Sequence, residues 1–229
     1  MKHLLKLLDC STEEIIGLLD LADQLKYEKK HNISHRHLEG KSLGMIFQKS
    51  STRTRVSFET GMYQLGGQAL FLSNRDLQIG RGEPVQDTAR VLSRYLDGIM
   101  IRTYEQKEVE DLAGYGTIPI INGLTDFCHP CQVLADLMTI REKFAVLEGL
   151  KMCYIGDGNN MANSLIVGGL KTGMKVSVAT PEGYRPHPEV MAFAGANPDF
   201  SITDDPMKAA ENADVVITDT WASMGMEAE

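Results

Sequence analysis

The sequence predicts an α/β protein with two domains, each a parallel sheet flanked by helices. Short apolar runs that suit buried strands alternate with segments whose apolar residues recur at helical spacing, almost from end to end. The length of 229 residues is enough for one large or two small domains. A long helix predicted at 130–147 would bridge them. We therefore expect domains at 1–147 and 148–229, the second Rossmann-like and incomplete.

Composition narrows the class of protein. The chain is 43% hydrophobic and 24% charged, and its net charge of −8 argues against non-specific binding to nucleic acid or anionic membranes. No apolar run is long enough to span a bilayer, and the N-terminus lacks a signal-peptide core. Four cysteines in this length do not suggest a disulfide scaffold. We expect a cytoplasmic protein with neither nucleic-acid nor membrane partners.

The first half alternates helices and strands. Ser11 and Glu14 form a capping box, which predicts a helix from residue 12. The alternation implies a parallel sheet with crossover helices, and in such sheets ligands bind at the carboxyl ends of the strands. The expected elements are helix 12–27, strand 43–48, helix 53–65, strand 69–72, helix 84–95, strand 98–102, helix 106–114 and strand 118–121.

The turn at residues 50–55 is the strongest local signal. It joins a strand to a helix N-terminus, where unpaired N–H groups and the helix dipole favour an anion. Its hydroxyls and two arginines, Arg53 and Arg55, add donors that match phosphate or carboxylate oxygens. A simple N-cap with an arginine-bearing solvent face is the alternative, but a cap needs only one hydroxyl.

The second half continues the alternation. The loop at 156–160 follows a strand, but it fits a dinucleotide fingerprint poorly because Met161 replaces the third glycine. Asn159 and Asn160 could serve a polar ligand or simply the turn. The expected elements are helix 130–147, strand 152–155, helix 161–172, strand 175–179, helix 188–195, strand 200–203, helix 205–212 and strand 215–218.

Two further segments carry polar groups at predicted strand ends. Cys128 and Cys131 have the spacing of a redox pair, yet four strands precede them, and zinc would require a second pair. That leaves His129 and Gln132 as neutral polar groups aimed at the sheet edge. Asp219 follows a buried-looking strand, where it could hold a ligand ammonium or cap the next element.

Together these motifs resemble the aspartate/ornithine carbamoyltransferase family. Residues 51–55 match its Ser-x-Arg-Thr-Arg signature and residues 129–132 its His-Pro-x-Gln element. The loops at 156–160 and 219–225 match the Gly-Asp-x-Asn-Asn and Asp-x-x-x-Ser-Met-Gly loops of the ornithine branch, which the aspartate branch lacks. The family continues through a His-Cys-Leu-Pro loop and C-terminal helices. We therefore expect this chain to be a fragment or a short form.

The resemblance implies transfer of the carbamoyl group from carbamoyl phosphate to L-ornithine, giving L-citrulline and phosphate without metal or organic cofactor. It implies catalytic roles for Arg53, Thr54, Arg102 and His129. It also implies a homotrimer, or a multiple of one, in which Gln78 reaches a neighbouring subunit's site. The implied carbamoyl phosphate residues are Ser51, Thr52, Arg53, Thr54, Gln78, Arg102, His129 and Gln132.

The implied ornithine residues combine a carboxylate clamp with an ammonium acceptor: Asn159, Asn160, Asp219, Ser223 and Met224. Two alternatives stay open. One is a carbamoyltransferase for another amine, such as putrescine. The other is a non-catalytic homologue that binds carbamoyl phosphate without turnover.

Overall fold

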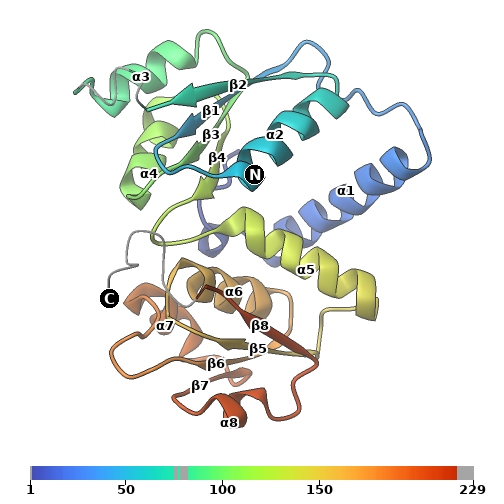
Figure 1. Cartoon of the computed structure of the whole chain (residues 1–229), viewed down its shortest axis with the longest axis vertical. Coiled ribbons are helices and arrows are strands. Elements are labelled where there is room, and N and C mark those ends of the chain that lie inside the picture. The colour runs from blue at the N-terminus through green and yellow to red at the C-terminus, as the bar shows by residue number, and fades with distance from the viewer. Residues whose placement is uncertain (1, 75–76, 78–81, 221–229) are drawn as a thin grey trace. The chain divides into compact units, whose positions relative to one another are not determined.

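The structure is a computed structural model that describes residues 2–74, 77 and 82–220. It divides into two compact units, one of Met1–Lys6 with Asp20–Asp126 and one of Leu7–Leu19 with Phe127–Glu229. Each unit contains a four-stranded, all-parallel sheet flanked by helices (Figure 1). The predicted fold class is confirmed. The expected boundary at residue 147 stays a prediction.

The sheet of the first unit has the strand order β2-β1-β3-β4. The chain leaves β1 for β2 on one side and then crosses to β3 on the other, so the order reverses between β1 and β3. In register, Phe47 at the end of β1 lies beside Arg102 at the end of β3. The elements are β1 (Ser42–Phe47), α2 (Thr52–Gln64), β2 (Gln68–Ser73), α3 (Val85–Leu92), β3 (Gly98–Arg102), α4 (Gln106–Tyr115) and β4 (Ile120–Leu124).

Alternation along β1 sends neighbouring side chains to opposite faces of this sheet. Met45 and Phe47 pack with Met62 of α2 on one face. Ile46 packs with Ala89 of α3 and with α4 on the other. In Figure 1, α2 accordingly lies on one side of the sheet and α3 and α4 on the other. With both faces covered, β1, β3 and β4 are buried, as their apolar sequences predict, while the edge strand β2 keeps exposed positions.

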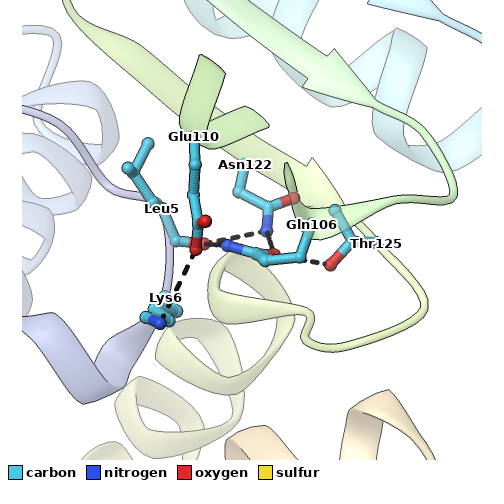
Figure 2. A network of polar contacts seen from close by, with 6 residues as sticks. All are labelled: Leu5, Lys6, Gln106, Glu110, Asn122 and Thr125. Atoms are coloured by element: carbon cyan, nitrogen blue, oxygen red, sulfur yellow. Dashed lines mark hydrogen bonds and ion pairs between the residues drawn. The ribbon is translucent and has the colours of Figure 1, made fainter. Parts of the chain in front are cut away.

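The N-terminal segment is held against the outer edge of β4. The Leu4 carbonyl accepts from the Asn122 amide at 2.8 Å, and Leu4 forms a parallel bridge with β4. The buried Asn122 side chain donates to the Leu5 carbonyl at 2.8 Å. Gln106 Oε1 accepts from Thr125 Oγ1 at 2.8 Å, and Gln106 Nε2 donates to the same Leu5 carbonyl at 3.4 Å (Figure 2). Asn122 thus anchors the N-terminal segment to β4.

The sheet of the second unit has the order β7-β6-β5-β8, so here the order reverses between β5 and β8. Helix α6 is buried along most of its length and packs on β5 and β6, while α8 covers the other face through Ala209. The elements are η1 (Leu7–Asp9), α5 (Pro130–Phe144), β5 (Lys151–Ile155), α6 (Asn160–Lys171), β6 (Lys175–Ala179), α7 (Pro188–Ala194), β7 (Phe200–Thr203), α8 (Pro206–Ala210) and β8 (Val215–Thr218).

Helix α1 (Thr12–Lys30) starts at the predicted capping box. Ser11 Oγ accepts from the Glu14 amide at 3.1 Å, and Glu14 accepts from the Ser11 amide at 2.9 Å. The short helix η1, which the sequence did not predict, precedes it. Lys171 holds η1 in place by donating to the Leu7 and Leu8 carbonyls at 3.0 and 2.7 Å.

Most predicted element ends lie within a few residues of the observed ones. The helix expected at 130–147 stops at Phe144, because Ala145 adopts a left-handed conformation with φ of 65° that ends the helix. The strand expected at 118–121 begins at Ile120. Within the described residues, no helix has both the length and the apolar character needed to cross a membrane.

Candidate functional site

The first candidate site lies at the carboxyl ends of β1 and β3. This is where the strand order of the first sheet reverses, and ligands of open parallel sheets bind at such points. The amide of Gln48, directly after β1, donates to the Arg102 carbonyl at 2.9 Å. The turn that carries Ser51 to Arg53 is therefore anchored to the strand that ends in Arg102.

Ser51 is the N-cap of α2. Its backbone is extended, and its Oγ accepts from the Thr54 amide at 3.2 Å and donates to Thr54 Oγ1 at 3.0 Å. The capping alternative is thus correct for Ser51, but it accounts for one hydroxyl only. Thr52 and Arg53, the first two residues of α2, remain exposed at the positive end of the helix.

Two guanidinium groups lie near each other at this point. The Arg102 residue is only 3% exposed, and its Nε atom is buried without a hydrogen-bond partner among the described residues. Burial lowers the pKa of Arg102, and the nearby charge of Arg53 lowers it further. A buried cation facing a second cation favours an anionic ligand, which would supply acceptors and offset the repulsion.

Arg55, the other arginine of the turn, is engaged elsewhere. Its Nε donates to Glu59 at 3.0 Å, one helical turn away, and its guanidinium lies 3.7 Å from the ring centre of Phe71. Of the two arginines that the sequence put forward, Arg53 is therefore the better placed to bind an anion.

Glu108 on α4 is a residue that the sequence analysis missed. One of its carboxylate oxygens accepts from the side chain of Gln48, and the other accepts from Thr103 Oγ1 at 2.5 Å. It thereby ties the turn after β1 to the end of β3. Only the tertiary fold brings a helix residue between these two strand ends.

The second candidate site lies at the carboxyl ends of β5 and β8, where the order of the second sheet reverses. The buried Tyr154 near the end of β5 has its pKa raised by burial and then by the negative charges of Asp219 and Asp157. Asp219 follows β8 directly. An acidic residue in this position suits a ligand ammonium group, as the sequence predicts.

Asn159 is the N-cap of α6. Its Oδ1 accepts from the Met161 and Ala162 amides at 2.9 and 3.3 Å. Asn159 thus serves the backbone of this turn, which is the alternative that the sequence left open, while a role in ligand binding stays a prediction. Asn160 is the first residue of α6, and its carbonyl accepts from Ser164 Oγ at 2.9 Å.

His129 stands at the N-terminus of α5. Its amide donates to Ser164 Oγ at 2.8 Å, which fixes the start of α5 against α6. One turn into α5, Gln132 Nε2 donates to Asp136 Oδ1 at 2.9 Å. Asp136 is the second residue that the sequence analysis missed. Its spacing of four residues from Gln132 on a predicted helix could have indicated the pair.

The Cys128–Cys131 pair does not fit redox chemistry. All four cysteines lie in the described part of the chain, and none forms a disulfide. Burial raises the pKa of Cys131 to about 12, which suppresses the thiolate that such chemistry needs. The described residues also contain no cluster of three or more metal-binding side chains. Gln78, Ser223 and Met224 lie outside the described residues.

Two family profiles cover the chain. Residues 2–142 match "Aspartate/ornithine carbamoyltransferase, carbamoyl-P binding domain", and residues 148–229 match "Aspartate/ornithine carbamoyltransferase, Asp/Orn binding domain". The chain belongs to the aspartate/ornithine carbamoyltransferase family. The resemblance drawn from its motifs is confirmed.

Individual members of this family are closely similar. The ornithine carbamoyltransferase of Thermococcus kodakarensis is 54% identical over the whole chain, which spans 74% of that protein. The solved ornithine carbamoyltransferase of Pyrococcus furiosus is 56% identical, with a TM-score of 0.95 over 99% of this chain and 74% of its own. The solved enzyme of Giardia lamblia is 34% identical, with a TM-score of 0.84; the match covers 96% of this chain and 74% of the Giardia chain.

Proposed function

We propose that this protein transfers the carbamoyl group of carbamoyl phosphate to the side-chain amine of L-ornithine, releasing L-citrulline and phosphate. The observation that carries the proposal is the buried Arg102 beside Arg53 at a capped helix N-terminus, in a chain whose similar relatives are named ornithine carbamoyltransferases. The Ser-Met-Gly motif at 223–225 favours the ornithine branch.

Phosphate would bind at the turn of the first unit. The N-terminal amides of α2 supply hydrogen-bond donors, the hydroxyls of Ser51, Thr52 and Thr54 supply more, and Arg53 and Arg102 supply positive charge. Phosphate is also the leaving group. The same groups would stabilise the negative charge that it gains as its bond to the carbamoyl carbon breaks.

The carbamoyl group would be recognised by hydrogen-bond donors and one acceptor. Thr54, Arg102 and His129 would polarise its carbonyl oxygen, on which negative charge develops when the amine attacks. Gln132 would accept from the carbamoyl NH2. Gln78 would contribute from a neighbouring subunit, which accords with a homotrimer or a multiple of one.

Ornithine would bind through its α-amino acid end. Asn159, Asn160 and Met224 suit its carboxylate, and Asp219 and Ser223 suit its ammonium. The side-chain amine must lose a proton before it attacks, because a lysine-like amine has a pKa of about 10.4 and is almost fully protonated at neutral pH. The amine nitrogen then bonds to the carbamoyl carbon, the C–O bond to phosphate breaks, and the nitrogen gives up a second proton, which the released phosphate can accept. We further propose that the protein works in the cytoplasm.

The test is citrulline formation by the purified protein from carbamoyl phosphate, with L-ornithine, putrescine and L-aspartate as competing acceptors. Turnover with L-ornithine alone is the expected result. Preference for putrescine would favour the first alternative. Carbamoyl phosphate binding by calorimetry without carbamoylation of any acceptor would favour a non-catalytic homologue and contradict the proposal.

A further inference from the structure

Glu108 on α4 joins the two chain segments that carry the arginines of the first candidate site. One of its carboxylate oxygens accepts from the side chain of Gln48, and the other accepts from Thr103 Oγ1 at 2.5 Å. Thr103 directly follows Arg102, and Gln48 opens the turn that leads to Arg53. All five residues belong to the first unit. We propose that Glu108 is a positioning residue that holds Arg53 and Arg102 in place for a phosphate group. This inference rests on the proposed function.

A role confined to the helix is the alternative, because Glu108 lies in the first turn of α4, where a negative charge favours the helix dipole. Such a role requires no partner outside the helix. Both oxygens of Glu108 nevertheless bond outside it, since Gln48 lies 60 positions away and Thr103 precedes the helix. Thr103 is fully buried, and a buried hydroxyl requires a hydrogen-bond partner. The bonding pattern therefore favours a link between two strand ends.

The link opposes a repulsion between two guanidinium groups. Burial lowers the pKa of Arg102, and the charge of Arg53 lowers it further, as expected for two cations that repel each other. Without a ligand, this repulsion favours any movement of the turn that separates them. Glu108 restrains such movement, because it holds both the residue after Arg102 and the start of the turn. The site can then bind phosphate without a preceding rearrangement, which would weaken binding.

Other contacts also restrain the turn, so the loss of Glu108 should loosen the site without unfolding it. The Gln48 amide donates to the Arg102 carbonyl at 2.9 Å, and Lys49 Nζ bonds Asp126 at 2.5 Å. Both contacts remain when Glu108 is replaced. We therefore expect Glu108→Ala to weaken phosphate binding by about three- to tenfold, the range of one net hydrogen bond.

The experiment measures dissociation constants for inorganic phosphate and for carbamoyl phosphate by titration calorimetry. The proteins are the wild type, Glu108→Ala, Gln48→Ala and the double variant. Each single variant should weaken the binding of both ligands, because the ligands share the phosphate group. The double variant should bind about as well as Glu108→Ala alone, because the two side chains act through one contact.

Two further variants separate position from charge and from general damage. In Glu108→Gln, the amide oxygen can accept from Gln48 and the amide nitrogen can donate to Thr103 Oγ1, because a hydroxyl also accepts. This variant should bind phosphate nearly as well as the wild type, although its negative charge is gone. Asp111→Ala is the matched control, since Asp111 bonds Lys107 within the same helix. It should leave both dissociation constants unchanged.

Hydrogen exchange followed by mass spectrometry reports on the turn itself. Peptides that cover residues 48–55 should exchange faster in Glu108→Ala than in the wild type. Saturating phosphate should remove most of the difference, because the bound anion holds the two arginines together. If Glu108 served only the helix, the faster exchange would instead lie in α4, at residues 106–115.

Equal phosphate affinity in the wild type and Glu108→Ala, or losses in the two single variants that add in the double, would overturn the inference. A Glu108→Gln variant as weak as Glu108→Ala would also overturn it, because charge rather than position would then matter. Should Glu108→Ala not fold, Gln48→Ala must still weaken phosphate binding. A wild type that binds neither phosphate nor carbamoyl phosphate would overturn the proposed function itself. The two failures are therefore distinguishable.

Discussion

At the scale of single residues, a pair of like charges with one member buried or partly buried marks each candidate site. In the first unit the buried Arg102 faces Arg53, and in the second the partly buried Asp136 faces Asp219. Like charges brought together in this way destabilise a protein that binds nothing. An anion at the first pair and a cation at the second would each relieve the repulsion, which agrees with an acyl phosphate and an amino acid as ligands.

Arg53 and Arg55 offer a matched test, since they lie two residues apart on α2. Arg53→Ala should weaken carbamoyl phosphate binding by about 1.5–3 kcal/mol, because it removes a charge-assisted contact. Arg55→Ala should have a much smaller effect, because Arg55 is engaged by Glu59 and Phe71. Calorimetry with carbamoyl phosphate measures both. Equal losses in the two variants would contradict the assignment of Arg53.

We expect the free energy of unfolding to depend on pH because of Asp136. Its pKa is raised in the folded state, above all by burial, so the folded protein binds its proton more tightly than the unfolded chain. Stability contributed by this group is therefore present at low pH and is lost as pH rises from about 4 through the folded pKa. The stability of Asp136→Asn relative to the wild type should increase over that interval. Urea denaturation of both proteins at a series of pH values measures this, and a difference that does not change with pH would refute it.

At the scale of elements, two helix N-termini combine capping with ligand chemistry. Ser51 caps α2 and Asn159 caps α6, each at the point where its sheet reverses strand order. A cap satisfies only part of the first turn of a helix, so the remaining N–H groups and the dipole stay available to an anion. Phosphate at α2 and the carboxylate of ornithine at α6 would use the same property.

Asn159 permits its two roles to be separated. Asn159→Ala removes the cap and should cost about 0.5–2 kcal/mol of stability. Asn159→Asp keeps an acceptor for the cap, so stability should stay near that of the wild type, but the added charge should repel the ornithine carboxylate and raise the KM for ornithine. Asp205→Ala, which removes the cap of α8, is the control and should lower stability only. An unchanged KM in Asn159→Asp would limit Asn159 to capping.

At the scale of the whole molecule, the expectation is a trimer in which neighbouring subunits complete each other's sites. Arg53→Ala and Gln78→Ala should each be nearly inactive alone. When the two are unfolded together and refolded, about a quarter of the sites would combine an intact Arg53 with an intact Gln78 from the next subunit, and activity should return in that proportion. No recovery of activity on mixing would argue that each site is built from one chain.

Sedimentation of the wild type should give three times the 25.3 kDa chain mass, or a multiple of that value.

The sequence by itself determined the elements and the family. The runs at 98–102, 175–179, 200–203 and 215–218 became strands with those bounds. The first two are buried almost throughout, as continuous apolar runs predict, while the edge strands β7 and β8 keep exposed positions. The capping box at Ser11 and the signature at residues 51–55 are local too, since caps depend on residues three or four positions apart. The end of α5 differs from the predicted one, because a single backbone angle, the positive φ of Ala145, sets where the helix stops.

Only the tertiary structure decided which polar groups meet. Neither the strand order β2-β1-β3-β4 nor the order β7-β6-β5-β8 can be read from the chain, yet these orders set where each sheet reverses. Glu108 bonds Gln48, which lies 60 positions away in the chain, and the charge of Asp219 acts on Asp136 across 83 positions. Whether Arg102 is buried or solvated depends on what packs around it. Local sequence fixes which groups are present, but burial and charge proximity arise from packing, and they determine the chemistry of these groups.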